Sequence, residues 1–396
     1  METPAPRFFV VLRQRAPWPD LLAAAREIDA LGFDGLFLVD HFYGLFNVED
    51  PTHEAYTMLA ALAPFTQNVQ LGVLVCGNTY RNPAFLLKQA VTVDHVSGGR
   101  VIFGVGAGWV EREHEAYGWE FPSAKERVDR FAEALEIWDL LQREERTTYE
   151  GTHYQLIDAP FQPKPFGRPR LPLLIGGSKP RMLRLTARHA DLWNTIGTPK
   201  EAATVSRQLD DVCRQVGRDP AAITRGVSTG DDLLTSVEAF AAGVNAYRDA
   251  GFGDLYFSWP PAERERDVLR RAAREVIPSI RGDHSAPSTT SPTAPLRQLS
   301  AADVSAVAQV YADVSDATAR RLLDTLIDHP EERLDGAALM TRLNLQRHDE
   351  VARSFAALGA AFAARGLARP WNEAQRGYLL PQDRATILAQ ARSHQS

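Results

Sequence analysis

Short apolar segments alternate eight times with longer amphipathic segments in the part of the chain that precedes Gly282. This alternation is typical of parallel strands joined by crossover helices. Because eight βα units match a closed barrel, we predict an α/β fold with a (β/α)8 TIM barrel over residues 1–282. The predicted strands are Phe8–Leu12, Leu36–Asp40, Val69–Cys76, Val101–Val105, Leu171–Ile175, Leu192–Ile196, Ile223–Ser228 and Asp254–Trp259. The predicted helices are Pro19–Leu31, Glu54–Phe65, Pro83–Val96, Ala124–Leu141, Pro180–Ala190, Lys200–Val216, Ser236–Ala250 and Glu263–Val276.

A stretch without large apolar residues, His284–Pro295, follows the predicted barrel and contains three prolines. Such a segment buries too little surface to offset the entropy of ordering it. We therefore predict a Ser/Thr/Pro linker over residues 283–298. All of the formal net charge of −6 lies before Leu296, because 12 arginines and 12 acidic residues cancel after it.

The last part of the chain, residues 299–396, is predicted to be a small, mainly helical domain that resembles a winged helix. Its predicted helices are Ala301–Tyr311, Ala317–Ile327, Gly336–Leu343 and Arg347–Arg365, with short strands at Arg333–Leu334 and Gly377–Leu380. A winged helix that reads DNA usually has a basic recognition helix, whereas this domain is neutral and contains no lysine. We expect it to pack or to make a dimer contact, with nucleic-acid binding as the alternative.

Composition indicates a globular protein that works on small molecules. Apolar residues make up 44% of the chain and charged residues 24%, which is typical of folded domains. The net charge of −6 disfavours nucleic acids and anionic membranes, since both bind clustered cations. No apolar run is long enough to span a bilayer, and the N-terminus does not resemble a signal peptide, so we expect a cytoplasmic protein. Cys76 and Cys213 lack metal-ligand spacing, so we expect reduced thiols and no metal site.

Polar residues stand at the C-terminal end of the second predicted strand, where Asp40 is the last residue and His41 follows it. The functional residues of a TIM barrel lie after the C-terminal ends of its strands, so this pair is expected at the barrel mouth. Histidine titrates near neutral pH, and a carboxylate can fix its tautomer. We predict His41 to be the catalytic acid or base. The alternative is an exposed loop histidine bonded to its own turn.

Small and aromatic residues follow the third and fourth predicted strands. Gly104, Gly106 and Gly108 remove side chains from the mouth, and Trp109 offers a flat surface beside them. We expect a planar ligand here and an apolar substrate pocket formed by Phe42, Phe46 and Trp109. The glycines also fit two other interpretations, a strand bulge or the fingerprint of an open dinucleotide-binding sheet, although Trp109 breaks that fingerprint.

The segment Gly176–Arg181 leads from the fifth predicted strand into a helix. Free backbone N–H groups at the helix start, Ser178 and the cations Lys179 and Arg181 together predict an anion site, which we expect to bind phosphate. The alternative is a plain helix-capping turn. The chain contains no P-loop, zinc-protease or nucleophile-elbow motif. The charged residues Glu111, Arg112, Glu113 and Glu115 are expected to form a solvated loop.

Several motifs together carry a resemblance that none of them carries alone. They are Val39–Phe42, Leu71–Pro83, Asp94–Arg100, Gly104–Trp109, Gly176–Ser178 and Ala190–Asn194. Over roughly residues 7–280 the chain resembles the bacterial luciferase-like monooxygenase superfamily, and within it the branch of coenzyme F420-dependent oxidoreductases.

The resemblance implies a barrel that holds the tricyclic ring of F420, or of FMN, in its mouth and the phosphate at Gly176–Arg181. It implies that Asp40 and the Cys76–Gly77 backbone contact the ring and that His41 handles the substrate proton. It also implies a non-prolyl cis peptide between Val73 and Cys76, a homodimer, and a separate F420 or flavin reductase as a partner. The expected cofactor-binding residues are Asp40, Cys76, Gly77, Asn78, Gly106, Gly176, Gly177, Ser178, Lys179 and Arg181.

The chain departs from the family pattern at two neighbouring positions. Trp109 stands where the F420-dependent sugar-phosphate dehydrogenases have a catalytic glutamate, so their reaction is not transferred to this chain. Val110 stands where close relatives often have asparagine, which removes a polar group near the cofactor.

Three functional hypotheses follow. The leading one is an F420-dependent oxidoreductase that transfers hydride between the deazaflavin and a small organic substrate. The second is a monooxygenase that uses reduced FMN and oxygen, which the same barrel supports. The third, from another class, is a flavin-sensing regulator whose C-terminal domain binds nucleic acid; it requires DNA binding that depends on the cofactor and weakens with salt.

Overall fold

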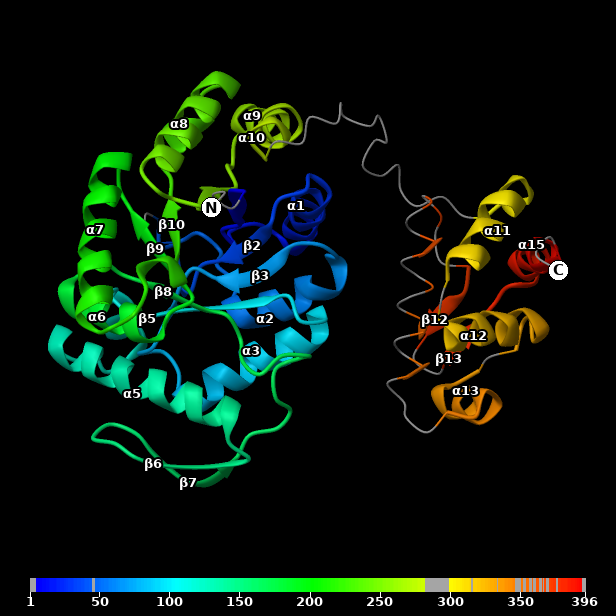
Figure 1. The fold of residues 1–396 in the computed structure, drawn as a ribbon, viewed down its shortest axis with the longest axis horizontal. Coiled ribbons are helices and arrows are strands. Elements are labelled where there is room, and N and C mark those ends of the chain that lie inside the picture. The colour runs from blue at the N-terminus through cyan, green and yellow to red at the C-terminus, as the bar shows by residue number, and fades with distance from the viewer. Residues whose placement is uncertain are drawn as a thin grey trace. The chain divides into compact units, whose positions relative to one another are not determined.

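The chain divides by its contacts into two compact units, residues 1–287 and 288–396. The computed structural model describes residues 5–44, 47–281, 299–314, 316–332, 334–345, 350–351, 354–355, 358, 361–362, 365, 367, 370–374 and 377–393 (Figure 1). The predicted linker, residues 283–298, lies outside the described residues. It stays a prediction.

The first unit is a closed barrel of parallel strands surrounded by helices (Figure 1). Its strands are β1 (Arg7–Val11), β2 (Gly35–Leu38), β3 (Gln70–Val73), β4 (Cys76–Gly77), β5 (Val101–Gly106), β8 (Leu173–Gly176), β9 (Leu192–Ile196), β10 (Thr224–Ser228) and β11 (Asp254–Ser258). The order is β3-β2-β1-β11-β10-β9-β8-β5-β4, and pairing of β3 with β5 closes the ring. The prediction of a (β/α)8 TIM barrel is confirmed.

The third strand of the barrel is interrupted at residues 74–75, which separate β3 from β4. The peptide bond between Leu74 and Val75 is cis, within the interval that the family resemblance implied. Past the interruption β4 pairs with β5, with Cys76 opposite Val105 and Gly77 opposite Gly106.

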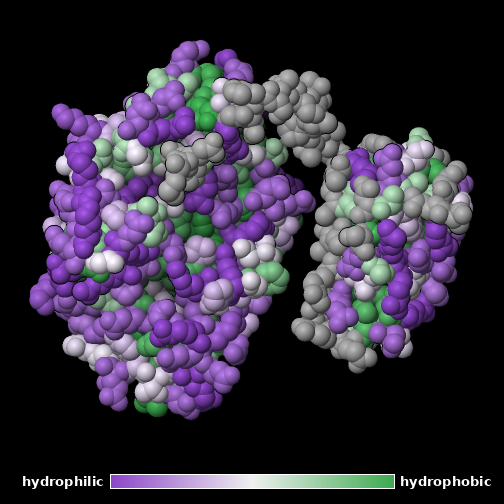
Figure 2. All heavy atoms as spheres, in the orientation of Figure 1, coloured by the Kyte–Doolittle hydropathy of each residue, from purple (hydrophilic) through white to green (hydrophobic). Residues whose placement is uncertain are grey.

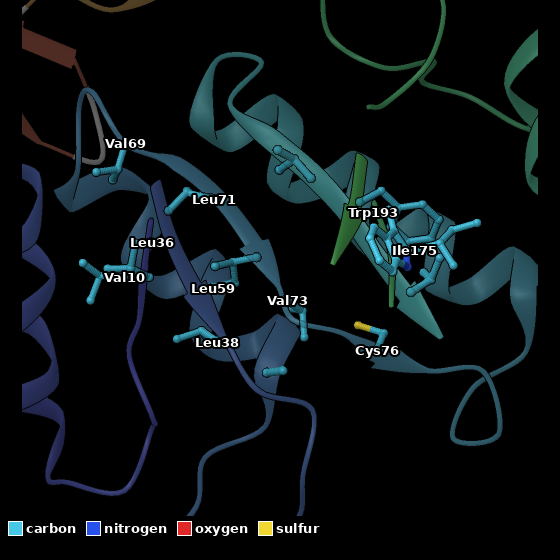
Figure 3. Close-up of a cluster of buried hydrophobic side chains, with 14 of the residues drawn as sticks. Val10, Leu36, Leu38, Leu59, Val69, Leu71, Val73, Cys76, Ile175 and Trp193 are labelled. Atoms are coloured by element: carbon cyan, nitrogen blue, oxygen red, sulfur yellow. The ribbon is translucent and has the colours of Figure 1, made fainter. Parts of the chain in front are cut away.

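Two layers of apolar side chains explain why the strands are apolar on both faces. Phe8 and Val10 of β1 point outward and belong to the large core between strands and helices. Phe9 and Val11 alternate with them and point into the barrel, where Phe9 stacks on Tyr256 with ring centroids 4.6 Å apart. Figure 3 shows part of the outer core, in which Leu59 lies beside Leu36, Leu38 and Leu71. In Figure 2 the visible surface is correspondingly mostly hydrophilic.

The helices of the barrel unit follow the predicted order, and prolines begin three of them. Pro83, Pro180 and Pro199 occupy the first turn of α3, α6 and α7, where the missing N–H costs no hydrogen bond. The helices are α1 (Trp18–Ala30), α2 (Ala55–Leu62), α3 (Pro83–Ser97), α4 (Glu111–Tyr117), α5 (Ala124–Arg143), α6 (Pro180–His189), α7 (Pro199–Gln215), α8 (Val237–Asp249), α9 (Glu263–Arg271) and α10 (Ile277–Arg281).

The sequence did not predict α4, the short helix α10, or an antiparallel hairpin of β6 (Arg146–Glu150) and β7 (Gln155–Pro160). The hairpin lies at the edge of the barrel unit in Figure 1. Its strands are largely exposed, so they lack the buried apolar pattern by which the barrel strands were found.

The motif Asp94–Arg100 stabilises the fold at the start of β5. Asp94 is fully buried and accepts hydrogen bonds from the backbone N–H groups of Val101 and Phe166 and from Arg168. Arg100 donates to the carbonyl oxygens of Ala63, Thr66, Val69 and Ser97. These contacts lie at the N-terminal end of the strands, which in TIM barrels serves stability.

The second unit is mainly helical, as predicted, and has its own apolar core. Its elements are α11 (Val304–Asp313), α12 (Ala317–Asp328), α13 (Gly336–Leu343), β12 (Asn372–Ala374), β13 (Gly377–Leu379) and α15 (Gln382–Ser393). Strands β12 and β13 pair as an antiparallel ribbon, and Leu334 forms a bridge with Tyr378. The predicted helix Arg347–Arg365 lies partly outside the described residues, and the likeness to a winged helix stays a prediction.

Candidate functional site

A cavity of about 1160 Å³ opens at the C-terminal ends of the barrel strands, where TIM barrels place their functional residues. Most of the predicted site residues line it. They are Asp40, His41, Cys76, Gly77, Gly106, Trp109, Gly176, Gly177, Ser178, Lys179 and Arg181. Burial raises the pKa of the Cys76 thiol well above its usual value, so this wall presents a neutral thiol.

His41 is held at the cavity by Glu113. The Nδ1 atom of His41 lies 3.0 Å from Oε2 of Glu113, and the imidazole side chain is 16% exposed. Glu113 is fully buried and also accepts hydrogen bonds from the Tyr80 hydroxyl at 2.6 Å and the Phe42 backbone N–H at 2.8 Å. Burial acts to raise the pKa of Glu113, yet these three hydrogen bonds lower it overall. The ionised carboxylate therefore accepts from Nδ1–H of His41 and leaves Nε2 free to take up a proton.

The prediction of a solvated charged loop at Glu111–Glu115 is wrong. These residues begin α4, and the helix turns Glu113 and His114 inward while Glu111 and Glu115 remain exposed. Gly118, in the left-handed conformation at φ 70°, ends the helix. A run of charges looks solvated in sequence, and the donors that make burial of Glu113 favourable come from two other loops, His41 and Phe42 after β2 and Tyr80 after β4.

Asp40 is fixed by a second ion pair. It is 3% exposed, and both carboxylate oxygens lie 2.8 Å from guanidinium nitrogens of Arg81. Its Oδ2 also accepts from the backbone N–H of Gly77 at 3.1 Å. Burial acts to lower the pKa of Arg81, but the hydrogen bonds and charge of Asp40 raise it overall, so the pair is ionic. Arg81 was not predicted as a site residue, since nothing in the sequence shows that its loop meets Asp40.

The far end of the cavity has the features of an anion site. Lys179 is the N-cap of α6 and makes no capping bond with its side chain, so the first N–H groups of the helix are available. Lys179 is exposed, and no ion pair involves it among the described residues. Arg181 differs from the expectation of a free cation, because its guanidinium binds Asp129 and the carbonyl oxygen of Lys125.

The glycines of β5 and the one at the end of β8 have a packing role, which for Gly104 and Gly106 agrees with the alternative interpretation of a strand bulge. A Cβ at Gly104 would lie 2.0 Å from the carbonyl oxygen of Val73, and one at Gly106 would lie 3.0 Å from the side chain of Val75. A Cβ at Gly176 would also meet Val75, at 2.9 Å. These glycines therefore make room for the interrupted third strand, and that strand in turn presents Leu74 and Val75 to the cavity.

The predicted substrate-pocket residues separate in the structure. Trp109 lines the cavity and is 69% exposed. Phe42 does not line it, because its ring packs against Tyr80, Tyr117 and Trp119. Phe46 lies outside the described residues.

Two asparagines also differ from expectation. Asn78, expected to bind cofactor, lies away from the cavity lining: it is buried and its Nδ2 donates to the Tyr154 hydroxyl at 3.2 Å. Asn194, for which no role was predicted, lines the cavity. Its Oδ1 accepts from Ser228, and its buried Nδ2 has no hydrogen-bond partner in the described part of the chain. A buried donor of this kind suits a ligand that carries an acceptor.

Within the described residues, no group of three or more His, Cys, Asp or Glu side chains is arranged to hold a metal ion. No helix in the same part of the chain combines the length and the apolar composition needed to cross a membrane.

Comparison with known proteins gives consistent matches to the barrel unit. The family model of the luciferase-like monooxygenases matches residues 5–230. An F420-dependent glucose-6-phosphate dehydrogenase of Microbacterium testaceum (strain StLB037) is 34% identical over 214 residues, which are 53% of this chain and 60% of that protein. An enzyme of the same name from Amycolatopsis mediterranei (strain U-32) is 30% identical over 315 residues, covering 66% of this chain and 94% of that protein.

A solved structure with the same fold is an F420-dependent secondary alcohol dehydrogenase in complex with an F420–acetone adduct. It superposes with a TM-score of 0.62 at 18% identity, covering 68% of this chain and 98% of that one. At this identity the match establishes the barrel fold.

Proposed function

The chain belongs to the luciferase-like monooxygenase family, and we propose that it is an F420-dependent oxidoreductase that exchanges hydride with a small organic substrate. The relatives named above support F420 over FMN. The observation that carries the proposal is the His41–Glu113 contact at the cavity wall, because transfer of a hydride to or from a carbon–oxygen group requires a partner for the proton.

The residues present fit such a cofactor. The cavity has a volume of about 1160 Å³, which is large enough for a tricyclic ring with a tail. The unpartnered Nδ2 of Asn194 offers a donor for a ring carbonyl, and Val75 forms an apolar support that the neighbouring glycines accommodate. At the other end Lys179 and the start of α6 suit a phosphate.

In this proposal the residues that line the cavity have distinct roles. Asp40, Cys76, Gly77 and Gly106 line the place of the ring, and Gly176 to Lys179 bind the phosphate of the tail, with Arg181 beside them. When bound, F420 supplies a carbon centre that accepts or donates hydride. Trp109, exposed at the same cavity, covers the reacting region and limits access of water.

His41 moves the proton. In the direction of alcohol oxidation, Nε2 accepts the proton of the substrate hydroxyl, and the resulting imidazolium is stabilised by the ionised Glu113 at Nδ1. In the direction of carbonyl reduction the same nitrogen returns the proton. Tyr80 donates to the same carboxylate and therefore fixes its orientation.

The test is an activity screen with a matched variant. The full chain is incubated with F420 and a panel of primary and secondary alcohols, or with reduced F420 and the corresponding carbonyl compounds, and F420 fluorescence is followed. Turnover is expected with at least one pair, and His41→Asn should lower it by about 10²–10⁴-fold while F420 still binds. Oxygen uptake with reduced FMN, without any F420 turnover, would contradict the proposal.

A further inference from the structure

A second cavity of about 780 Å³ adjoins the first at the barrel mouth. The two share His41, Leu74, Trp109, Ile196 and Ser228. None of Gly176 to Arg181 lines the second cavity, which extends instead toward the loop after β1 and the ends of β10 and β11. His41 therefore stands at the junction of two compartments, and a ligand in the second can reach it without entering the first.

The wall of the second cavity is apolar over much of its extent. Val11, Val39, Leu74 and Leu233 contribute to it. Trp109 and Ile196 at the junction are 69% and 75% exposed, although large apolar side chains are usually covered. Exposed apolar surface concentrated in a hollow is typical of a ligand site. The body of a ligand in this cavity is therefore expected to be apolar.

A free cation lies in the same wall. Arg13 lies two residues after the end of β1, is exposed, and makes one long contact, 3.4 Å from Nη2 to the hydroxyl of Ser258. No carboxylate pairs with it among the described residues. Arg15, the other arginine of this wall, is already bound to Asp50 at 3.3 Å. Arg13 is thus the guanidinium available to an anionic ligand, and its planar fork suits a carboxylate or a phosphate.

Two further polar residues line this cavity, one a neutral hydrogen-bond donor and the other acidic. Tyr256 is 1% exposed and lines the wall, and its hydroxyl has no hydrogen-bond partner in the described part of the chain. Burial raises its pKa well above the usual value, so it remains a donor. Asp232, exposed on the same wall, carries a negative charge that disfavours a second anionic group.

We propose that this second cavity is the substrate site and that the substrate is an apolar organic anion, with its single carboxylate or phosphate bound by Arg13 and its reacting group at His41. The proposal rests on the oxidoreductase function above, since it assigns the substrate class of the same His41. It goes beyond that function because it names the residue that selects the substrate by charge.

The experiment compares two fluorescent probes that share an apolar ring system. 1-Anilinonaphthalene-8-sulfonate carries one anionic group, and N-phenyl-1-naphthylamine carries none. Both are titrated into the full chain and into Arg13→Gln. The substitution should weaken binding of the anionic probe about tenfold and leave that of the neutral probe within about twofold, because only the charge-assisted contact is lost. Asp232→Asn should strengthen binding of the anionic probe, because it removes a negative charge from the same wall.

Matched variants locate the effect. Arg207 lies on α7 and lines neither cavity, so Arg207→Gln should leave the affinities for both probes unchanged. Lys179→Gln reports anion binding in the first cavity. The inference is overturned if Arg13→Gln leaves the ratio of the two affinities unchanged, or if only Lys179→Gln changes it. Circular dichroism of each variant confirms that the fold is retained.

The titrations contain no F420, so they are independent of cofactor binding. A chain that fails to bind F420 but shows the Arg13 effect would contradict the proposed function and support the charge selection. A chain that binds F420 without an Arg13 effect would support the proposed function and contradict the charge selection.

Discussion

Replacement of Glu113 by glutamine should destabilise the barrel and remove the preference of His41 for the Nδ1–H tautomer. Glu113 is fully buried and accepts from three donors, the closest at 2.6 Å. Glutamine keeps the shape but loses the charge and turns an NH2 group toward at least one donor. Since a hydrogen bond to a charged group contributes about 1.5–3 kcal/mol, we expect Glu113→Gln to lower the free energy of unfolding by about 2–4 kcal/mol.

The same change should reduce turnover. If the Glu113 contact favours the Nδ1–H tautomer by about 2–3 kcal/mol, its loss shifts the ratio of the two tautomers about 30- to 150-fold toward the unproductive Nε2–H form. Two measurements check this independently of any substrate. Selective 15N labelling of histidine reports the tautomer, and urea titration followed by tryptophan fluorescence reports the barrel, because six of the seven tryptophans precede the linker.

The pH dependence follows from the lowered pKa of Glu113. A carboxyl group whose pKa is depressed by folding contributes stability above its unfolded pKa of about 4.3, and this contribution is lost as pH falls through the folded pKa. The stability gap between the wild type and Glu113→Gln should therefore be full at pH 7 and close in acid below about pH 4.3. Glu115→Gln, an exposed glutamate on the same helix, should change stability by less than about 0.5 kcal/mol. A His41 in the Nε2–H tautomer in the wild type, or equal effects of the two substitutions, would show that Glu113 does not hold His41 as described.

Three further substitutions test the surroundings of the site. Gly104→Ala should lower the free energy of unfolding in urea by about 3 kcal/mol or more, because its Cβ would lie 2.0 Å from the Val73 carbonyl oxygen. Gly253→Ala is the control: an added Cβ there would meet no atom of a described, non-adjacent residue within 4 Å, so the free energy of unfolding should change by less than about 1 kcal/mol. Arg81→Gln should cost about 3–5 kcal/mol by leaving buried Asp40 unpaired; an unchanged urea midpoint would show that the pair is not needed. Trp109→Ala should leave the urea midpoint unchanged, since the residue is 69% exposed, yet raise the KM of the substrate about 2- to 12-fold in steady-state assays.

The barrel could be predicted from the sequence because its strands are buried on both faces and its helices on one. All eight strand positions were found, with shifts of one or two residues at their ends. The β6–β7 hairpin was missed for the opposite reason, since its strands are exposed and carry no apolar alternation. Burial, more than propensity, determined which elements the pattern disclosed.

The site could be predicted only as far as it follows strand ends. Asp40, His41 and Trp109 were located because each lies within three residues of the end of a strand. Glu113 and Arg81 were not, although they hold His41 and Asp40 in place, because their partners lie on loops distant in sequence. Phe42 was misplaced because its backbone and not its ring serves the site: the N–H binds Glu113 and the ring packs among Tyr80, Tyr117 and Trp119.

The most direct test of the account is titration of the purified full chain with oxidised F420 and, separately, with FMN, following ligand fluorescence. We expect saturable F420 binding that weakens in Lys179→Gln, with little or no binding of FMN. Tight binding of FMN without affinity for F420 would contradict it.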